Sequence, residues 1–161
     1  MQNYLAWIIL FSSSVSWGHG GVVHDNVKHQ DKEVHIEPSV KEKYQKINKN
    51  YLTSVKPLFQ RACMDCHGSN TEFPWYYAIP GVKQLIDNDI KEAKKHLDFS
   101  VDFPFKSHET PRKDLDAIES SLKQETMPPI QYRLLHKKSE LTKKDILKIN
   151  EWIQNSKEIL K

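Results

Sequence analysis

Two cysteines and a histidine lie close together in one short segment of the chain, and their spacing suits a specific chemistry. Cys63 and Cys66 are three residues apart, and His67 follows directly. A cysteine pair at this spacing with an adjacent histidine is the attachment signature of a c-type haem, in which each sulfur bonds one vinyl group and the imidazole binds iron. The segment predicts one covalently held haem c, with His67 as the proximal iron ligand.

Two other chemistries also use a cysteine pair: a redox-active dithiol and half of a zinc site. A thioredoxin-like dithiol is expected beside a βαβ pattern, which we do not find in this chain. A typical zinc site needs a second cysteine or histidine pair at close spacing, and the chain has no third cysteine. Both interpretations stay open beside the haem.

Met127 is the residue that the sequence offers as the second iron ligand. The chain has three methionines. Met1 leaves with a predicted signal peptide, and Met64 is held between the two cysteines, where it cannot reach the opposite face of the iron. Pro128 and Pro129 follow Met127, stop a helix and stiffen the loop. We therefore predict Met127 as the distal ligand, against the alternative of a methionine that fills a gap near the core.

The first 38 residues differ from the rest of the chain. Residues 1–18 carry no charge and contain an apolar run too short to span a bilayer, which predicts a secretory signal peptide although the usual positive residue is missing. The alternative is a buried N-terminal helix or an uncleaved anchor. We expect a periplasmic or otherwise exported bacterial protein, with no integral membrane span after signal cleavage.

Residues 19–38 are polar and show neither helical nor strand periodicity. We interpret them as a flexible linker. The segment contains four histidines, so a transition-metal site is the alternative interpretation: His19, His24, His29 and His35.

Residues 39–161 carry the periodicity of helices that would position the cysteines, His67 and Met127. Apolar residues recur three and four apart from residue 39 to residue 59. Pro57 should break or start a helix, with a helix over 58–66 that ends at Gly68. Further helices are predicted over 81–97, 110–124 and 142–160, the last two with Thr110 and Thr142 as N-caps. No strand signal of useful length appears, so we expect an all-α, small cytochrome c-like domain wrapped around one covalent haem.

Two segments should provide apolar surroundings. The helix over 81–97 has an apolar stripe that includes Leu85 and Leu97, and His96 near its end is either an alternative ligand or a surface residue. The aromatic loop over 70–80 would exclude water beside a haem, or would simply pack under the core.

These motifs, taken in order, resemble the haem-binding domain family of small mono-haem c-type cytochromes. The resemblance covers about residues 55–156 and extends beyond the cysteine motif. It rests on Val55-Lys56-Pro57-Leu58-Phe59, Cys63-Met64-Asp65-Cys66-His67, Phe73-Pro74-Trp75-Tyr76, Asp89-Ile90-Lys91-Glu92, His96-Leu97-Asp98-Phe99-Ser100, Met127-Pro128-Pro129, Tyr132 and Leu134-Leu135-His136.

The resemblance implies an all-helical mono-haem domain in which Cys63 and Cys66 attach the haem, His67 is proximal and Met127 is distal. Phe73 departs from the tryptophan common in the family. The polar linker is expected to lie outside the shared domain.

The leading functional hypothesis is an electron carrier and not an enzyme. Two saturated axial sites leave no room for a substrate, and a methionine ligand raises the potential relative to bis-histidine haem. One alternative is a haem enzyme or gas sensor with a displaceable distal ligand, in which His96, His108 or Arg112 would assist peroxidase-like chemistry. Another is a haem relay subunit of a larger oxidoreductase.

The charge of the chain gives a weak indication of its partners. The formal net charge is +3, from 24 basic and 21 acidic residues. Basic residues alternate with acidic ones and no recognition motif appears, so nucleic-acid binding is not expected. Redox partners with acidic docking surfaces would suit a lysine cluster that could equally be a solvated face: Lys137, Lys138, Lys143 and Lys144.

Overall fold

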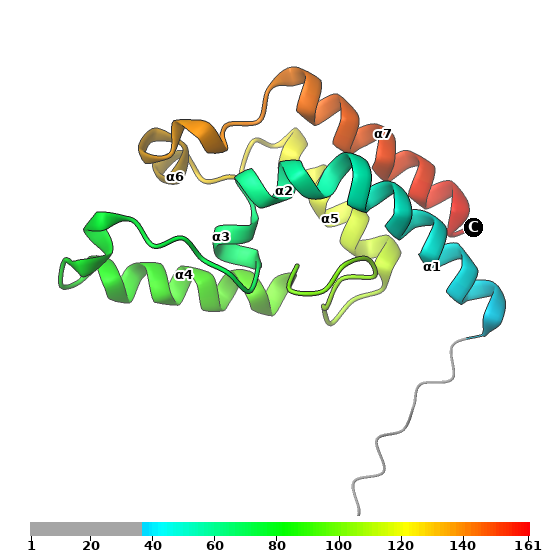
Figure 1. The fold of residues 1–161 in the computed structure, drawn as a ribbon, viewed down its shortest axis with the longest axis horizontal. Helices are drawn as coiled ribbons and strands as arrows, with labels where there is room; N and C mark the ends of the chain where they lie inside the picture. The colour runs from blue at the N-terminus through cyan, green and yellow to red at the C-terminus, as the bar shows by residue number, and fades with distance from the viewer. Residues whose placement is uncertain (1–36) are drawn as a thin grey trace, which may run out of the picture. The chain divides into compact units, whose positions relative to one another are not determined.

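A computed structural model describes residues 37–161, and this part of the chain is helical (Figure 1). Apart from an isolated bridge between Asp98 and Lys106, these residues form no β-structure, which confirms the predicted all-α class. The α-helices are α1 Pro38–Asn50, α2 Lys56–Ala62, α3 Met64–His67, α4 Val82–His96, α5 Pro111–Lys123, α6 Ile130–Leu135 and α7 Lys143–Ile159. A π-helical turn, η1 Tyr51–Val55, and two 3₁₀ turns, η2 Trp75–Ala78 and η3 Lys137–Ser139, complete the set.

The predicted signal peptide and all but the last two residues of the predicted linker lie outside the described residues. Those last two residues are Glu37 and Pro38, of which Glu37 caps α1 and Pro38 begins it. In the described part of the chain, no helix is long and apolar enough to cross a bilayer.

α1, η1 and α2 follow one another directly, and Pro57 lies in the first turn of α2. A proline is tolerated there because the first turn needs no N–H from it. The turn before it is wider than an α-turn, with the N–H of Lys56 donating to the carbonyl of Tyr51. A π-turn is a known way to absorb a local irregularity within a helix. The predicted helix start at Pro57 is therefore confirmed.

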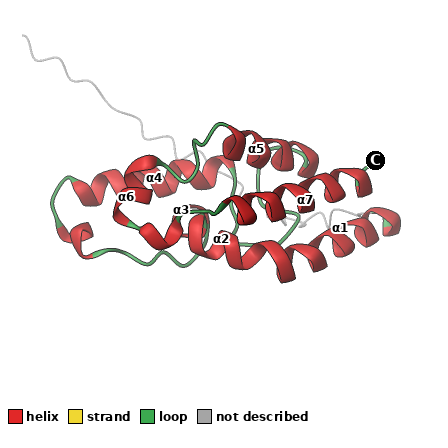
Figure 2. Ribbon diagram, turned by 90° about the horizontal axis from the view of Figure 1, so that it is seen from above, coloured by secondary structure: helices red, strands yellow, loops and turns green. Residues whose placement is uncertain are grey.

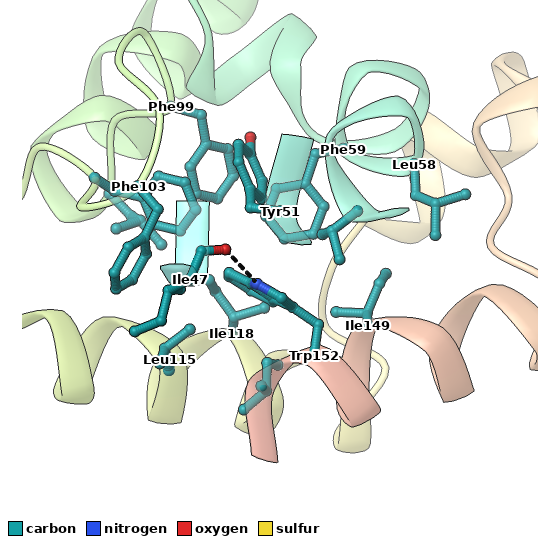
Figure 3. Packing of buried hydrophobic residues seen from close by; sticks show 14 of the residues in the cluster. Ile47, Tyr51, Leu58, Phe59, Phe99, Phe103, Leu115, Ile118, Ile149 and Trp152 are labelled. Carbon is teal, nitrogen blue, oxygen red and sulfur yellow. Dashed lines mark hydrogen bonds between the residues drawn. The ribbon is translucent and has the colours of Figure 1, made fainter. Parts of the chain in front are cut away.

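The hydrophobic core lies where α1, η1 and α2 meet α5 and α7, and the segment over 97–105 closes it (Figure 3). Tyr51 and Phe59 are almost fully buried, and their rings lie 5.8 Å apart, edge to face. The indole N–H of Trp152 donates to the carbonyl of Ile47 over 3.4 Å and joins α7 to α1. Truncating such a side chain to alanine typically costs about 3–5 kcal/mol. The core is Ile47, Tyr51, Val55, Leu58, Phe59, Leu97, Phe99, Phe103, Phe105, Leu115, Ile118, Leu122, Ile149, Trp152 and Ile153.

The starts of α5 and α7 follow the predicted capping. The hydroxyl of Thr110 accepts from the N–H of Lys113, and Pro111 begins α5. At α7 the hydroxyl of Thr142 accepts from the N–H of Asp145, whose carboxylate accepts in return from the N–H of Thr142. Such caps satisfy amide groups that have no partner inside the helix.

α4 differs from the other long helices because none of its residues is buried. Leu85, in the predicted apolar stripe, is 61% exposed, whereas Leu97 just beyond the helix is buried. The stripe is therefore only partly covered by protein. In both ribbon views α3, α4 and α6 lie toward one end of the described domain, and α1, α5 and α7 lie toward the other (Figure 2).

Candidate haem-attachment site

The cysteine motif consists of one residue between α2 and α3, followed by α3 itself. α2 ends at Ala62, its C-cap residue Cys63 has a φ of −126°, and α3 starts at Met64. The carbonyl of Cys63 accepts the N–H of Cys66 over 3.2 Å and the N–H of His67 over 3.0 Å. The predicted single helix over 58–66 is thus wrong in detail, because the chain bends at Cys63. Both thiols and the imidazole consequently lie on one turn.

Gly68 ends the turn as predicted, because a side chain at this position would lie too close to Met64. A Cβ atom at this position would lie 2.7 Å from the carbonyl oxygen of Met64 and 3.0 Å from its Cβ. The N–H of Gly68 also donates to that oxygen over 2.8 Å. Only a residue without a side chain fits so close to the preceding turn.

The imidazole of His67 is oriented by the segment that follows α4. Its Nδ1 lies 2.7 Å from the carbonyl oxygen of Leu97. A carbonyl oxygen can only accept a hydrogen bond, so Nδ1 must carry the proton and donate. The N–H of Phe99 donates to the carbonyl of His67 over 2.8 Å, and the two rings lie 5.3 Å apart. With Nδ1 protonated toward Leu97, the lone pair is at Nε2. This is the arrangement that metal-binding histidines use.

Burial of the site changes the acidity of its three chemical groups. Burial lowers the pKa of His67, which favours the neutral imidazole that a metal requires. Burial raises the pKa of Cys63 to about 12, and it also raises the pKa of Cys66, with further contributions from Asp65 and Asp89. Reactive dithiols instead have lowered thiol pKa values. Burial of the two thiols thus acts in the direction opposite to that of a reactive dithiol.

The residues around the turn fit a haem. The two cysteines are free thiols, and His67 presents one unprotonated ring nitrogen. Beside them, α3 packs against α4, whose apolar stripe is half-exposed and thus available to a flat apolar group. Within residues 37–161, no group of three or more His, Cys, Asp or Glu side chains could hold a metal ion. Cys63, Cys66 and His67 are the groups that would hold a c-type haem.

Met127 lies in the loop between α5 and α6, and 43% of it is exposed. It contributes with Pro128 and Arg133 to the wall of a surface cavity of about 250 Å³. Met64 is partly buried and packs against the core. Distal ligation by Met127 stays a prediction.

The other residues considered for chemistry lie in different places. His96 is exposed at the end of α4. The guanidinium of Arg112 donates to the carbonyl of Lys157 over 2.9 Å, so it joins α5 to α7. His108 is exposed in the loop before α5. Trp75 in the aromatic loop is 85% exposed. His96 directly precedes Leu97, whose carbonyl oxygen faces His67.

Sequence reasoning gave no role to two residues that connect the motif to α6. The hydroxyl of Tyr132 donates a short hydrogen bond to the carboxylate of Asp65, which lies between the two cysteines. The same carboxylate accepts the N–H of Glu72, and the carbonyl of Asp65 accepts the hydroxyl of Thr71 over 2.8 Å. Tyr132 stood among the motif residues of the resemblance, but no spacing rule pairs residues 67 positions apart.

The described residues form a helical domain with the cysteine motif in one turn, and a comparison with known families identifies its family. The chain matches the haem-binding domain family over residues 21–155. It therefore belongs to this family, and the expected family is confirmed. The match begins at residue 21, so it includes most of the polar segment that we expected to lie outside the shared domain.

A curated relative is the cytochrome c peroxidase Ccp of Escherichia coli (strain K12). It is 36% identical over 98 residues, which is 60% of this chain and 21% of that protein. The chain thus matches about a fifth of the relative's length. No solved structure matches the chain.

Proposed function

We propose that the protein is a mono-haem c-type cytochrome that carries electrons. Cys63 and Cys66 would attach the haem through thioether bonds, His67 would bind the iron from one face and Met127 from the other. The main support is the position of His67, which lies on the same turn as both thiols. Its Nδ1 faces the carbonyl oxygen of Leu97. That geometry leaves Nε2 as the ligand atom.

In this proposal the protein orients the ligands and limits access to them. The bound haem supplies a one-electron couple. The Leu97 carbonyl and the ring of Phe99 hold the imidazole in one orientation. As a soft ligand, the thioether of Met127 would favour ferrous iron and raise the potential. If His67 and Met127 both held the group, a small substrate would have no open position on it.

Absorption spectroscopy of the holoprotein tests the ligand set. Wild type, Met127→Ala and the matched control Met64→Leu are produced with haem-maturation machinery. We expect the near-infrared band of methionine-bound ferric haem in wild type and in Met64→Leu, and its loss in Met127→Ala. A high-spin wild type without that band contradicts distal methionine ligation.

Denaturing electrophoresis with haem staining tests covalent attachment separately. Thioether bonds survive denaturation, so the stain should stay with the wild-type chain. It should be lost from the Cys63→Ala/Cys66→Ala variant. A wild-type chain that loses its haem on denaturation overturns the c-type assignment while leaving haem binding intact.

A second candidate is a role in peroxide chemistry, either as a haem enzyme or gas sensor with a displaceable ligand or as a relay subunit. The similarity to a protein named cytochrome c peroxidase favours it. The matched region is about a fifth of that protein, which suits a relay better than a complete enzyme. Peroxide turnover, or rapid carbon monoxide binding by the untreated ferrous protein, would favour the enzyme or sensor over the carrier.

We also propose export to the periplasm and docking to acidic redox partners. Exposed lysines at η3 and at the start of α7 support the docking proposal: Lys137, Lys138, Lys143 and Lys144. Electron-transfer rates with an acidic partner should then fall as salt rises. Recovery of a chain shortened at its N-terminus from the periplasmic fraction tests export.

A further inference from the structure

We propose that Tyr132 is a positioning residue that holds α6, and with it the Met127 loop, against the cysteine turn. The expected effect of Tyr132 on the iron rests on the proposed ligands His67 and Met127. The contacts that Tyr132 makes within the protein do not depend on that proposal. We define the α6 latch as Asp65, Tyr132, His136 and Tyr76.

The α6 latch joins three segments that are far apart in sequence. The Tyr132 hydroxyl donates to the Asp65 carboxylate within the cysteine turn. The ring of His136 stacks on that of Tyr132, with centroids 4.2 Å apart and planes 23° from parallel. His136 Nδ1 lies 3.1 Å from the Tyr132 carbonyl, and its Nε2 lies 3.4 Å from the hydroxyl of Tyr76 in η2. Both ring nitrogens can thus be satisfied, one as donor and one as acceptor.

The surroundings of Tyr132 stabilise its hydrogen bond to the Asp65 carboxylate. It is half-buried, and a hydrogen bond to a charged oxygen is stronger when partly shielded from water. Burial, together with the Asp65 carboxylate, raises the pKa of Tyr132, so the phenol remains a donor. The Asp65 carboxylate is itself held by the N–H of Glu72. The bond therefore joins two groups that other contacts already restrain.

The Met127 loop is restrained at both ends. At the α5 end, the N–H and hydroxyl of Thr126 donate to the carbonyl of Ser121 over 3.1 and 3.3 Å. At the other end, α6 begins at Ile130, and Tyr132 ties its first turn to Asp65. The first restraint relates the loop only to α5. Because the second relates it to the turn that carries His67, it sets how far Met127 can move from that turn.

Loss of the Tyr132 bond should loosen α6 and open the iron face opposite His67. The holoprotein is compared as wild type and Tyr132→Phe, with Tyr77→Phe as the matched control. Tyr77 also donates to an aspartate, Asp87 over 2.6 Å, but lies outside the α6 latch. Two quantities are measured: the rate of imidazole binding to the ferric protein and the amide hydrogen exchange of α6, where the N–H groups of Arg133 and His136 report on the helix.

We expect both rates to rise about tenfold in Tyr132→Phe and to stay at the wild-type level in Tyr77→Phe. The near-infrared band should weaken in Tyr132→Phe. Asp65→Asn should raise both rates less than Tyr132→Phe does, because an amide oxygen still accepts from the phenol but carries no charge. If Tyr132→Phe does not fold, His136→Ala, which removes the stacked ring, should show a smaller change in the same direction. α6 exchange in Tyr132→Phe that equals the wild-type rate overturns the proposal.

Met127→Ala separates this proposal from the proposed ligand set. If Met127 is the ligand, this variant should bind imidazole faster while α6 exchange stays unchanged. If its spectrum and imidazole binding equal those of wild type, distal ligation by Met127 is wrong. The role proposed for Tyr132 can still be tested in that case. Faster hydrogen exchange of α6 in Tyr132→Phe supports it, and unchanged exchange overturns it.

Discussion

At the scale of single residues, the chemistry of the site depends on backbone atoms as much as on side chains. His67 could be picked out from sequence because histidine follows the cysteine pair. Its orientation depends on the carbonyl of Leu97, 30 residues later, which no residue type reveals. Every residue except proline offers the same N–H and C=O groups, so their partners are decided by the fold.

Gly68→Ala should disturb the attachment turn. The new methyl group would lie 2.7 Å from the Met64 carbonyl oxygen, so the turn must shift. Overpacking of this kind typically costs about 1–3 kcal/mol. We expect a lower melting temperature and a smaller yield of covalently loaded protein, measured against Ser69→Ala, an exposed neighbour. Equal yield and melting temperature for the two variants would contradict the contact argument.

At the scale of elements, the sequence predicts the starts of helices better than it predicts which of their faces are buried. α5 and α7 start at the predicted caps because capping is a local interaction within four residues. The stripe on α4 predicts a helix correctly, but its burial depends on neighbours that local sequence does not specify. The bend at Cys63 was missed for the same reason, since helix periodicity continues across it.

The capping group of α7 should make stability fall in acid. Hydrogen bonds from the hydroxyl and N–H of Thr142, and the nearby Arg61, lower the pKa of Asp145 below its usual value. A carboxylate with a depressed folded pKa stabilises above its unfolded pKa of about 3.9, and this contribution is lost as the pH falls through the folded pKa.

Urea unfolding at pH 7 and at pH 3 measures this effect. The acid loss of unfolding free energy should be smaller in Asp145→Asn than in wild type, and it should be unchanged in Glu151→Gln, an exposed residue of the same helix. Thr142→Ala should cost about 1 kcal/mol at pH 7. An acid loss in Asp145→Asn as large as that of wild type contradicts the assignment.

At the scale of the described domain, the hydrophobic core and the candidate haem site are adjacent but distinct. Phe99 links them, with its ring 4.9 Å from Phe59 in the core and 5.3 Å from His67. α7 buries Ile149, Trp152 and Ile153, whereas α4 buries none of its residues. Helices gain most of their stability from packing of an apolar face. α4 should therefore depend on the haem more than α7 does.

Hydrogen exchange of haem-loaded wild type and haem-free Cys63→Ala/Cys66→Ala tests this dependence. Amides of α4 should be protected in the loaded protein and should exchange much faster in the haem-free variant. Amides of α7 should change much less. Equal protection of α4 and α7 in the haem-free variant would show that α4 is stable without the cofactor.

The sequence by itself determined the helical class and the family of this protein, and it predicted the residues of the candidate site. The order of Cys63, Cys66 and His67, the helical periodicity and the caps are all local features, and local interactions act over a few residues. The tertiary structure decided the partner of His67, the approach of Tyr132 to Asp65 and the exposed stripe of α4. These depend on contacts between segments 30 to 67 positions apart, which form only when the whole chain packs. Such contacts involve backbone carbonyls and single hydroxyl groups. These groups produce no periodic pattern in the sequence, so their partners cannot be predicted from it.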